Sequence, residues 1–196
     1  RAFLNRRGGK PVLAEAAALM ARHVFAALAV AHEQGVVHRD VKPENLLISS
    51  AGELKLSDFG IAHLAGIDQM TVTGQILGSP AYMSPEHIEM AELDARADIF
   101  SLGTLLYEMA VGRMPFSGNN PHHIIKRIIE GYYDHPLSVN PAVGHGVASI
   151  IVRCMQTQRE RRYDSAAAVV VELDAVLAEM GIVPGAAELA AFFADP

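Results

Sequence analysis

Apolar side chains recur at helical spacing along much of the sequence and divide the chain into predicted helices. Between residues 12 and 34 they return every three or four positions, and this run ends at Gly35. Four more helical patterns follow, at residues 94–112, 120–131, 147–156 and 165–181. The pattern over 94–112 is apolar on most sides, which predicts a central and nearly enclosed helix.

Two short apolar runs, 46–48 and 54–57, favour strands instead of helix. The residues between them, "SSAGE" at 49–53, favour a turn, so the segment predicts a β-hairpin. A polar, glycine-rich stretch runs from about Gly60 to Pro85, and a loop of that length in a compact domain is usually functional or disordered. Together the elements predict a mainly α fold with one small sheet.

The last part of the chain carries signals for one helix and an open question after it. Ser165 is a candidate N-cap for the helix at 165–181, and Gly181 is a candidate stop. Residues 181–196 could form a short final helix or lie loose. A length of 196 residues suits one domain with a substantial core.

Composition narrows the class of protein. The net charge of −6 argues against a nucleic-acid surface, which needs a basic face. The single cysteine, Cys154, excludes an internal disulfide and fits a reducing compartment, so we expect a cytoplasmic protein. The longest apolar stretch, from Val12, is interrupted by Glu15, Arg22 and His23, which favours a buried helix over a membrane span.

Charged and polar residues are concentrated in "VVHRDVKPENLLI" (36–48), between two apolar segments. The predicted hairpin brings Asn45, at the entry of its first strand, beside Asp58, at the exit of its second. An amide oxygen and a carboxylate make a candidate Mg²⁺ site that leaves positions for phosphate and water. Asp40 and Lys42 lie on the same rim and add a proton acceptor and a cation. This set of groups suits phosphoryl transfer.

Three motifs carry a resemblance to a known family. "HRDVKPEN" (38–45), "DFG" (58–60) and "SPE" (84–86) resemble the catalytic loop, the metal-binding loop and the end of the activation segment of protein kinases. Their order and spacing agree with that family as well. The lysine of "DVKPEN" resembles the serine/threonine class, and "GSPAYMSPE" resembles bacterial kinases of the eukaryotic-like type.

The resemblance implies a role for each polar residue of the rim. Asp40 would orient the substrate hydroxyl and accept its proton, and Lys42 would contact the γ-phosphate of ATP. Asn45 and Asp58 would hold Mg²⁺, for which Mn²⁺ could substitute. The cofactors implied are therefore ATP and a divalent cation, and the partners are protein substrates.

The family pattern also implies supporting residues around the rim. Glu44 and Leu47 fall at the nucleotide, with Leu47 beneath the adenine ring. His38 and Phe59 would be structural residues that pack under the site. Asp98, in "ADIFSLG", matches the buried aspartate that holds the backbone of the catalytic loop, as a carboxylate in an apolar helix would require.

A second implied contact lies at the end of the activation segment. Glu86 and Arg162 resemble an ion pair that fastens this segment to the lower helices. The sequence departs from the family here, because Gln158 and Arg159 stand where the family has "DP" before this arginine.

Regulation is implied in the activation loop. Thr71 and Thr73 fall where bacterial kinases of this type carry activating phosphothreonines, and Arg39 is placed to grip such a phosphate. Ser79 replaces a more frequent threonine that contacts the catalytic loop in the substrate pocket. A kinase–kinase dimer could serve autophosphorylation in trans.

The resemblance covers only part of a kinase domain. Before residue 36 we find no glycine-rich loop, strand lysine or helix glutamate. We therefore expect residues 1–180 to be the helical C-terminal lobe of the α+β kinase fold, without its N-terminal β lobe, and residues 181–196 to be a tail. The lobe alone would be inactive, and membrane anchors of a parent protein would lie outside it. The alternative is a pseudokinase or kinase-derived scaffold that binds protein partners.

Overall fold

The computed structural model describes residues 10–49, 52–59 and 80–194. The helices are α2 (Ala14–Glu33), α5 (Pro85–Ile88), α6 (Ala95–Val111), α7 (Pro121–Glu130), α8 (Pro136–Val139), α9 (His145–Cys154), α10 (Ala166–Glu179) and α11 (Ala186–Ala194). Short 3-10 turns are η1 (Pro43–Asn45), η2 (Pro80–Tyr82), η3 (Pro141–Val143) and η4 (Arg159–Arg161). Strands β1 (Leu46–Ile48) and β2 (Leu54–Leu56) form an antiparallel pair with Leu47 opposite Lys55. The mainly helical fold with one hairpin is confirmed.

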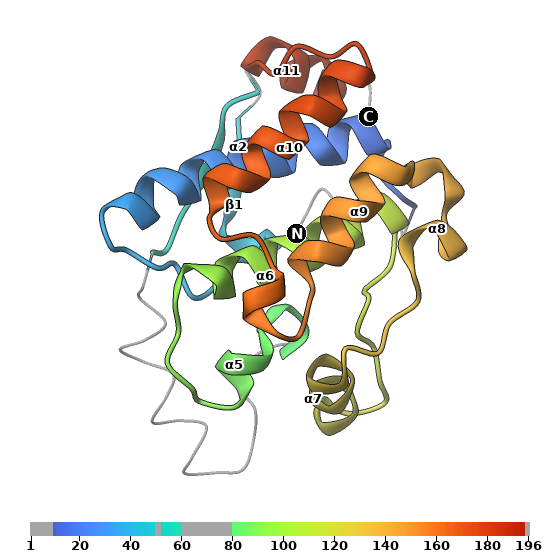
Figure 1. Cartoon of the computed structure of the whole chain (residues 1–196). Helices are drawn as coiled ribbons and strands as arrows, with labels where there is room; N and C mark the ends of the chain where they lie inside the picture. The colour runs from blue at the N-terminus through green and yellow to red at the C-terminus, as the bar shows by residue number, and fades with distance from the viewer. Residues whose placement is uncertain (1–9, 50–51, 60–79, 195–196) are drawn as a thin grey trace.

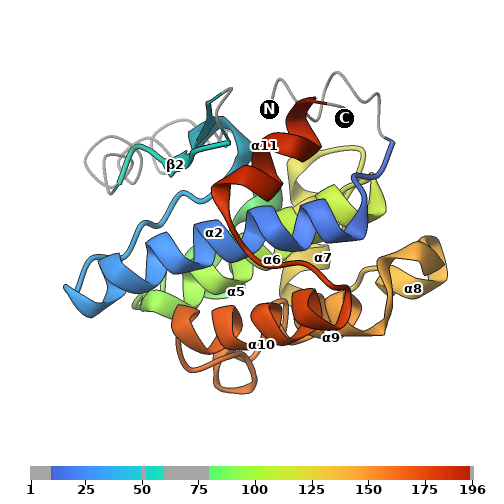
Figure 2. The ribbon, with the colours of Figure 1, turned by 90° about the horizontal axis from the view of Figure 1, so that it is seen from above.

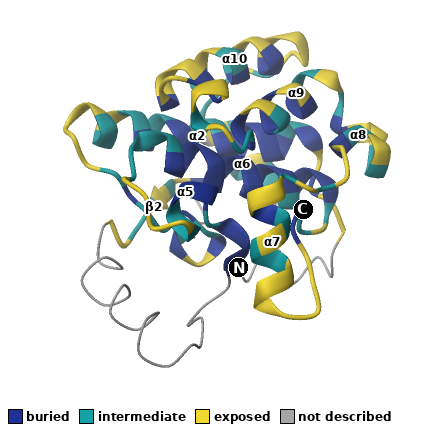
Figure 3. Cartoon of the chain, turned by 60° about the horizontal axis from the view of Figure 1, so that its bottom comes forward, coloured by how far each residue is buried: buried dark blue, intermediate teal, exposed yellow. Residues whose placement is uncertain are grey.

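Two helices form the centre of the lobe. Helix α2 packs between α10 and α6, and α9 packs on the other side of α6 (Figure 1). In α6, all residues except Ala95, Arg96 and Glu108 are buried, which confirms the enclosed helix predicted from its apolar sequence. Figure 3 shows the buried ribbon at α2 and α6, while the outer faces of α7 and α10 are exposed.

Helix ends follow the sequence signals closely. The Ser165 side chain accepts a hydrogen bond from the Ala168 backbone N–H, as expected of an N-cap, and Gly181 has a φ of 76° after the end of α10. Helix α9 begins two residues earlier than predicted. The reason is Gly144, whose φ of 73° turns the chain into the helix while its carbonyl accepts from the Ala148 N–H.

The contact between α6 and α9 depends on a glycine. A Cβ placed on Gly103 would lie 2.5 Å from the Cβ of Cys154, so only glycine allows the two helices to approach this closely. Cys154 is buried, and burial raises the pKa of its thiol far above the ordinary value. The cysteine is therefore a packing residue.

Helix α2 is long and apolar enough to cross a membrane by length and composition alone. Core helices of folded domains meet the same criteria. Ten residues of α2 are buried, and α6, α10, β2 and α11 all contact it. This packing agrees with the interpretation of the segment as a buried core helix.

Helix α11 (Ala186–Ala194) follows α10 in the described chain. Six consecutive residues of α2, Ala16–Ala21, are buried, so the helix is covered on all sides over this stretch. Helix α11 folds back over α2 and supplies one of those sides (Figure 2). Its Leu189 is fully buried, and Phe192 packs against the same core.

We expect Leu189→Ala to destabilise the chain by about 2–4 kcal/mol, because it leaves a cavity beside α2. The matched control is Val183→Ala, at a side chain that is 75% exposed, with an expected change within about 0.5 kcal/mol. Urea denaturation followed by circular dichroism measures both. Equal effects would contradict the docking of α11 on the core.

Candidate active site

A buried carboxylate on α6 holds the loop that follows α2. Asp98 is 1% exposed, and its oxygens accept hydrogen bonds from the backbone N–H of His38 at 2.8 Å and of Arg39 at 2.7 Å. Arg39 has a φ of 68°, a conformation that a non-glycine residue adopts only under constraint. The geometry matches the contact expected for Asp98, since the carboxylate fixes the backbone one residue before Asp40.

The His38 side chain connects this loop to the hairpin through hydrogen-bonding distances at both ring nitrogens. Its Nε2 lies 2.9 Å from the Ser57 carbonyl oxygen, and its Nδ1 lies 3.2 Å from the Asp40 backbone nitrogen. The arrangement fits a ring that donates from Nε2 and accepts at Nδ1. His38 is fully buried, and its ring lies 4.6 Å from that of Phe59, centroid to centroid. Phe59 thus packs on His38, although 37% of Phe59 stays exposed.

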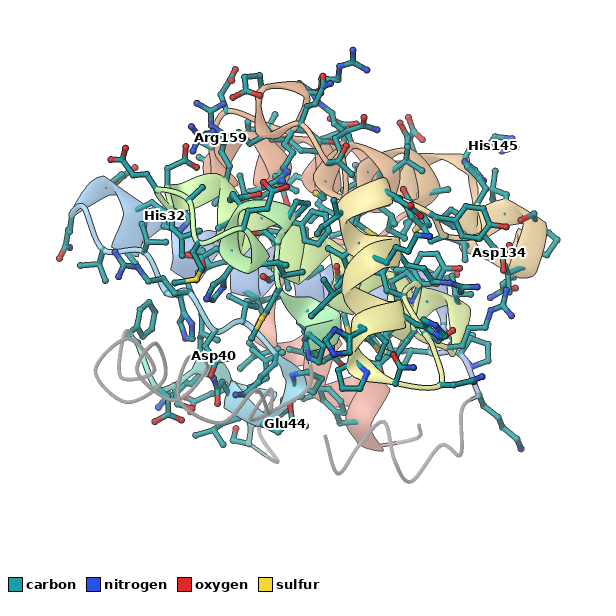
Figure 4. The ribbon with its side chains drawn as sticks, turned by 90° about the horizontal axis from the view of Figure 1, so that it is seen from below. His32, Asp40, Glu44, Asp134, His145 and Arg159 are labelled. Atoms are coloured by element: carbon teal, nitrogen blue, oxygen red, sulfur yellow. The ribbon has the colours of Figure 1, made fainter. Side chains whose placement is uncertain are left out.

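Two polar residues of the loop, Lys42 and Asn45, contact the same carboxylate oxygen of Asp40. Asp40 Oδ2 lies 2.6 Å from Lys42 Nζ and accepts a 3.1 Å hydrogen bond from Asn45 Nδ2. The same amide nitrogen donates to the Asp40 backbone carbonyl at 2.8 Å. Figure 4 shows Asp40 and the neighbouring Glu44 at one edge of the molecule. The loop therefore folds around Asp40 through contacts within six residues.

The hairpin brings the two predicted metal ligands to one end of the sheet. The Ser57 N–H donates to the Asn45 carbonyl at 2.9 Å, so Asp58 follows directly on a residue bonded to Asn45. Asp58 is exposed and has a φ of 63°. The Ser57 hydroxyl donates to its Oδ2 at 3.1 Å.

The oxygen atoms of Asn45 and Asp58 can be compared with the ligands that Mg²⁺ prefers. Because Asn45 uses its amide nitrogen on Asp40, its Oδ1 remains as the metal-binding atom. In the described part of the chain no three His, Cys, Asp or Glu residues form a cluster that could hold a metal. A carboxylate and an amide oxygen that share a cation with phosphate and water fit Mg²⁺, which rarely takes an all-protein shell.

The nucleotide side of the rim is open to solvent in the described residues. Leu47, expected beneath the adenine, is 57% exposed on β1, and Glu44 is exposed on η1. Thr71, Thr73 and Ser79 lie outside the described residues, so their assignments stay predictions. The Arg39 Nε is buried without a hydrogen-bond partner in the described chain, and its phosphate-binding role also stays a prediction.

The implied pair at the end of the activation segment is present and buried. Arg162 donates from Nη1 and Nη2 to the two carboxylate oxygens of Glu86 at 2.6 and 2.8 Å. Its remaining N–H groups donate to the carbonyls of Gln156, Arg96 and Thr157. Burial alone raises the pKa of Glu86, but the hydrogen bond and charge of Arg162, together with hydrogen bonds from the Glu86 backbone and Ser84, bring the net pKa below the ordinary value.

Two contacts of the site escaped the sequence analysis. His32, in the last turn of α2, lies 2.8 Å from Asp98 Oδ2 through its Nε2. Arg159, which stands in place of the family's proline, donates to the Glu92 carbonyl at 3.0 Å and pairs with Asp94. The sequence did show His32 as a polar residue in the last turn of an apolar helix, which indicates a polar contact. No local sequence feature indicated the partners of Arg159.

Comparison with known proteins places these features in a family. Residues 3–172 match the model described as "Protein kinase domain". The chain is 36% identical over 182 residues to serine/threonine-protein kinase PknL of Mycobacterium tuberculosis, covering 93% of this chain and 45% of that protein. It is 35% identical over 156 residues to a probable serine/threonine-protein kinase of Clostridium acetobutylicum, covering 80% of this chain and 24% of that protein. The chain thus spans less than half the length of these relatives.

We expect Arg162→Ala to cost about 3–5 kcal/mol of unfolding free energy, because it strands the Glu86 carboxylate in the core. Arg161→Ala, at the exposed neighbouring arginine, is the control and should change stability by less than about 0.5 kcal/mol. Urea denaturation at neutral pH distinguishes them. A cost for Arg162→Ala no larger than the control's would contradict the buried pair.

The lowered pKa of Glu86 also predicts an acid dependence. The folded pKa is below the unfolded one of about 4.5, so the stability that the pair contributes is present above that pH and is lost as the pH falls through the folded value. Wild type should exceed Glu86→Gln in stability at about pH 7, and the difference should shrink at about pH 4 and below. Urea midpoints across this range measure it. A difference that stays constant or widens toward acid would refute the assignment.

Proposed function

Because the chain belongs to the protein kinase domain family and its serine/threonine relatives are bacterial, we propose that it carries the phosphoryl-transfer site of a bacterial, eukaryotic-like serine/threonine kinase. The reaction would move the γ-phosphate of ATP to hydroxyl groups of protein substrates. One observation carries the proposal: Lys42 and Asn45 both contact the Asp40 carboxylate. The core holds the backbone next to Asp40 in place through the hydrogen bond between Asp98 and Arg39.

Asp40 is proposed to accept the proton of the substrate hydroxyl. Its Oδ2 is engaged by Lys42 and Asn45, and in the described chain Oδ1 carries neither of these contacts. Oδ1 is therefore the oxygen that we assign to the substrate. General-base assistance of this kind needs a fixed carboxylate within hydrogen-bonding reach of the hydroxyl, and the loop contacts supply the fixation.

Asn45 and Asp58 are proposed to hold Mg²⁺, and Lys42 to bind the phosphate that moves. When bound, the cation would neutralise charge on the phosphate oxygens. Lys42 Nζ lies 2.6 Å from Asp40 Oδ2, so the lysine lies beside the proposed base as the mechanism requires. Lys42 and Asp40 lie on the same rim as Leu47, whose exposed side chain fits a nucleotide-binding surface.

The 196-residue chain is proposed to be inactive by itself. The described residues build the catalytic loop and hairpin side of the nucleotide site, while Leu47 lacks cover. A scaffold without catalysis would have no need for Asp40, Lys42, Asn45 and Asp58 together, so the enzyme is the better proposal. A cytoplasmic location and pairing of two kinase domains for autophosphorylation are further proposals, the first supported by the single buried cysteine.

Mass spectrometry of the intact protein with Mg-ATP tests the function. The chain alone should gain no phosphate. A chimera that places before Arg1 the part of the mycobacterial relative preceding the matched region should gain phosphate, because the nucleotide site is then complete. Asp40→Asn in the chimera should lower the rate by a factor of at least about 10².

The control is Asp134→Asn in the same chimera, at an exposed aspartate paired with Arg113 away from the rim. This variant should keep full activity. Phosphate gain that persists in Asp40→Asn would contradict the assignment of the base, and gain by the chain alone would contradict its proposed inactivity.

A further inference from the structure

The turn after α5 places a long apolar side chain where a glycine is usual. The Ala91 N–H donates to the Glu86 carbonyl at 2.9 Å, and the Met90 N–H donates to the His87 carbonyl at 3.3 Å. These two bonds form the Schellman motif that ends many helices, and Met90 occupies its left-handed position with a φ of 55°. Glycine adopts that conformation without strain, whereas methionine does not. The turn therefore carries a conformational cost that a glycine would avoid.

The fold gives the Met90 side chain little cover. It is 63% exposed, the largest exposed fraction among the methionines that the structure describes. Glu89 and Glu92 on either side of it are exposed, and neither forms an ion pair in the described chain. We call residues 89–92 the acidic turn. Strained residues are typical of sites that bind, and methionine is enriched at protein interfaces, so these features indicate a contact surface.

Contacts with the rest of the lobe hold the acidic turn in place. Glu86, whose carbonyl closes the turn, is bound by Arg162 at 2.6 Å. Arg159 donates to the Glu92 carbonyl at 3.0 Å, and the Asp94 side chain caps α6 directly after the turn. A turn that is already fixed loses little conformational entropy when a partner binds. The exposed methionine is therefore pre-organised for a contact.

A surface with the opposite charge lies at the end of α7, a helix that contacts α5. Tyr132 is 64% exposed and Ile129 is 41% exposed. The Arg127 guanidinium lies over the Tyr132 ring, 5.4 Å from its centroid, and forms no ion pair in the described chain. We call these three residues the aromatic patch. Helices α5 and α7 both lie at the bottom of the view in Figure 1, so the two surfaces belong to the same side of the lobe.

We propose that two copies of this chain associate through these surfaces, with the acidic turn of each copy on the aromatic patch of the other. Met90 packs on Tyr132 and Ile129, because a thioether contacts aromatic rings favourably. The two carboxylates of the turn pair with Arg127. Since the surfaces lie on contacting elements, one twofold axis can satisfy both contacts at once. The net charge of −6 opposes association elsewhere on the surface.

The inference assigns a surface to the pairing of two domains that was proposed above, and it depends on no step of phosphoryl transfer. Sedimentation velocity of the 196-residue chain, from about 5 to about 500 µM, measures the association directly. Wild type should form a reversible dimer. Its association constant should fall at least about tenfold between low salt and about 0.5 M NaCl, because the paired charges are exposed.

Met90→Gly separates the contact from the stability of the fold. It should weaken the dimer at least about tenfold, because it removes the central apolar side chain. Its urea midpoint should not fall, since glycine suits the left-handed position. A weaker dimer in this variant therefore cannot be attributed to unfolding.

Charge reversal tests which surfaces meet. Reversing the acidic turn with Glu89→Lys and Glu92→Lys, or reversing the patch with Arg127→Glu, should each weaken the dimer at least about tenfold. The combined variant should recover the association constant to within about threefold of wild type, because the reversed charges are again complementary.

The matched controls lie on α10, at the opposite end of the view in Figure 1. Val171→Ala shortens an apolar side chain that is 71% exposed, and Glu179→Lys reverses an exposed charge. Both should leave the association constant within about twofold of wild type. A wild-type chain that stays monomeric, a dimer that Met90→Gly does not weaken, or a combined variant without recovery would overturn the proposal. Because sedimentation needs no ATP, a failure of the proposed kinase activity leaves this result unaffected.

Discussion

The site depends on one buried carboxylate, that of Asp98. A charge within an apolar helix is tolerated only if donors surround it, and here the donors are two backbone amides of the catalytic loop and the ring of His32. The need to satisfy that charge therefore ties the loop to the core. Helix α6 is enclosed on nearly every side, so the carboxylate is attached to the least movable element of the lobe.

Short hydrogen bonds connect the loop held by Asp98 to the hairpin and to the proposed base. His38 joins the loop to Ser57 at the end of the hairpin, and Asn45 joins the hairpin back to Asp40. These contacts link the proposed base and the proposed metal ligands through neutral hydrogen bonds, so the exposed charges at the rim need not hold the structure together. Arg162 does comparable work at the end of the activation segment, where all its N–H groups are satisfied inside the protein.

Sequence reasoning reached most of the fold and the composition of the site, for identifiable reasons. Periodicity located α2, α6, α7 and α10, because each has a buried face long enough to show the period. It missed α5 and α8, which are single turns. It also left open whether residues 181–196 contain a helix, because α11 packs against α2, a contact between distant segments that local periodicity does not reveal. The family motifs supplied Asp98 and Arg162, whereas the position of His32 in the last turn of α2 marked a polar residue without indicating its partner, Asp98.

The two strained residues of the site, Arg39 and Asp58, show why the lobe has to fold around the rim. Each has a positive φ that its own side chain disfavours, so neither conformation is stable as a local choice. Arg39 is held from below by Asp98, and Asp58 follows the residue that bonds to Asn45 and His38. The unfavourable conformations lie next to the proposed base and at the proposed metal ligand, where geometry matters most for transfer of a phosphoryl group. The stability of the helical core offsets the strain at these two positions and so maintains the geometry of the site.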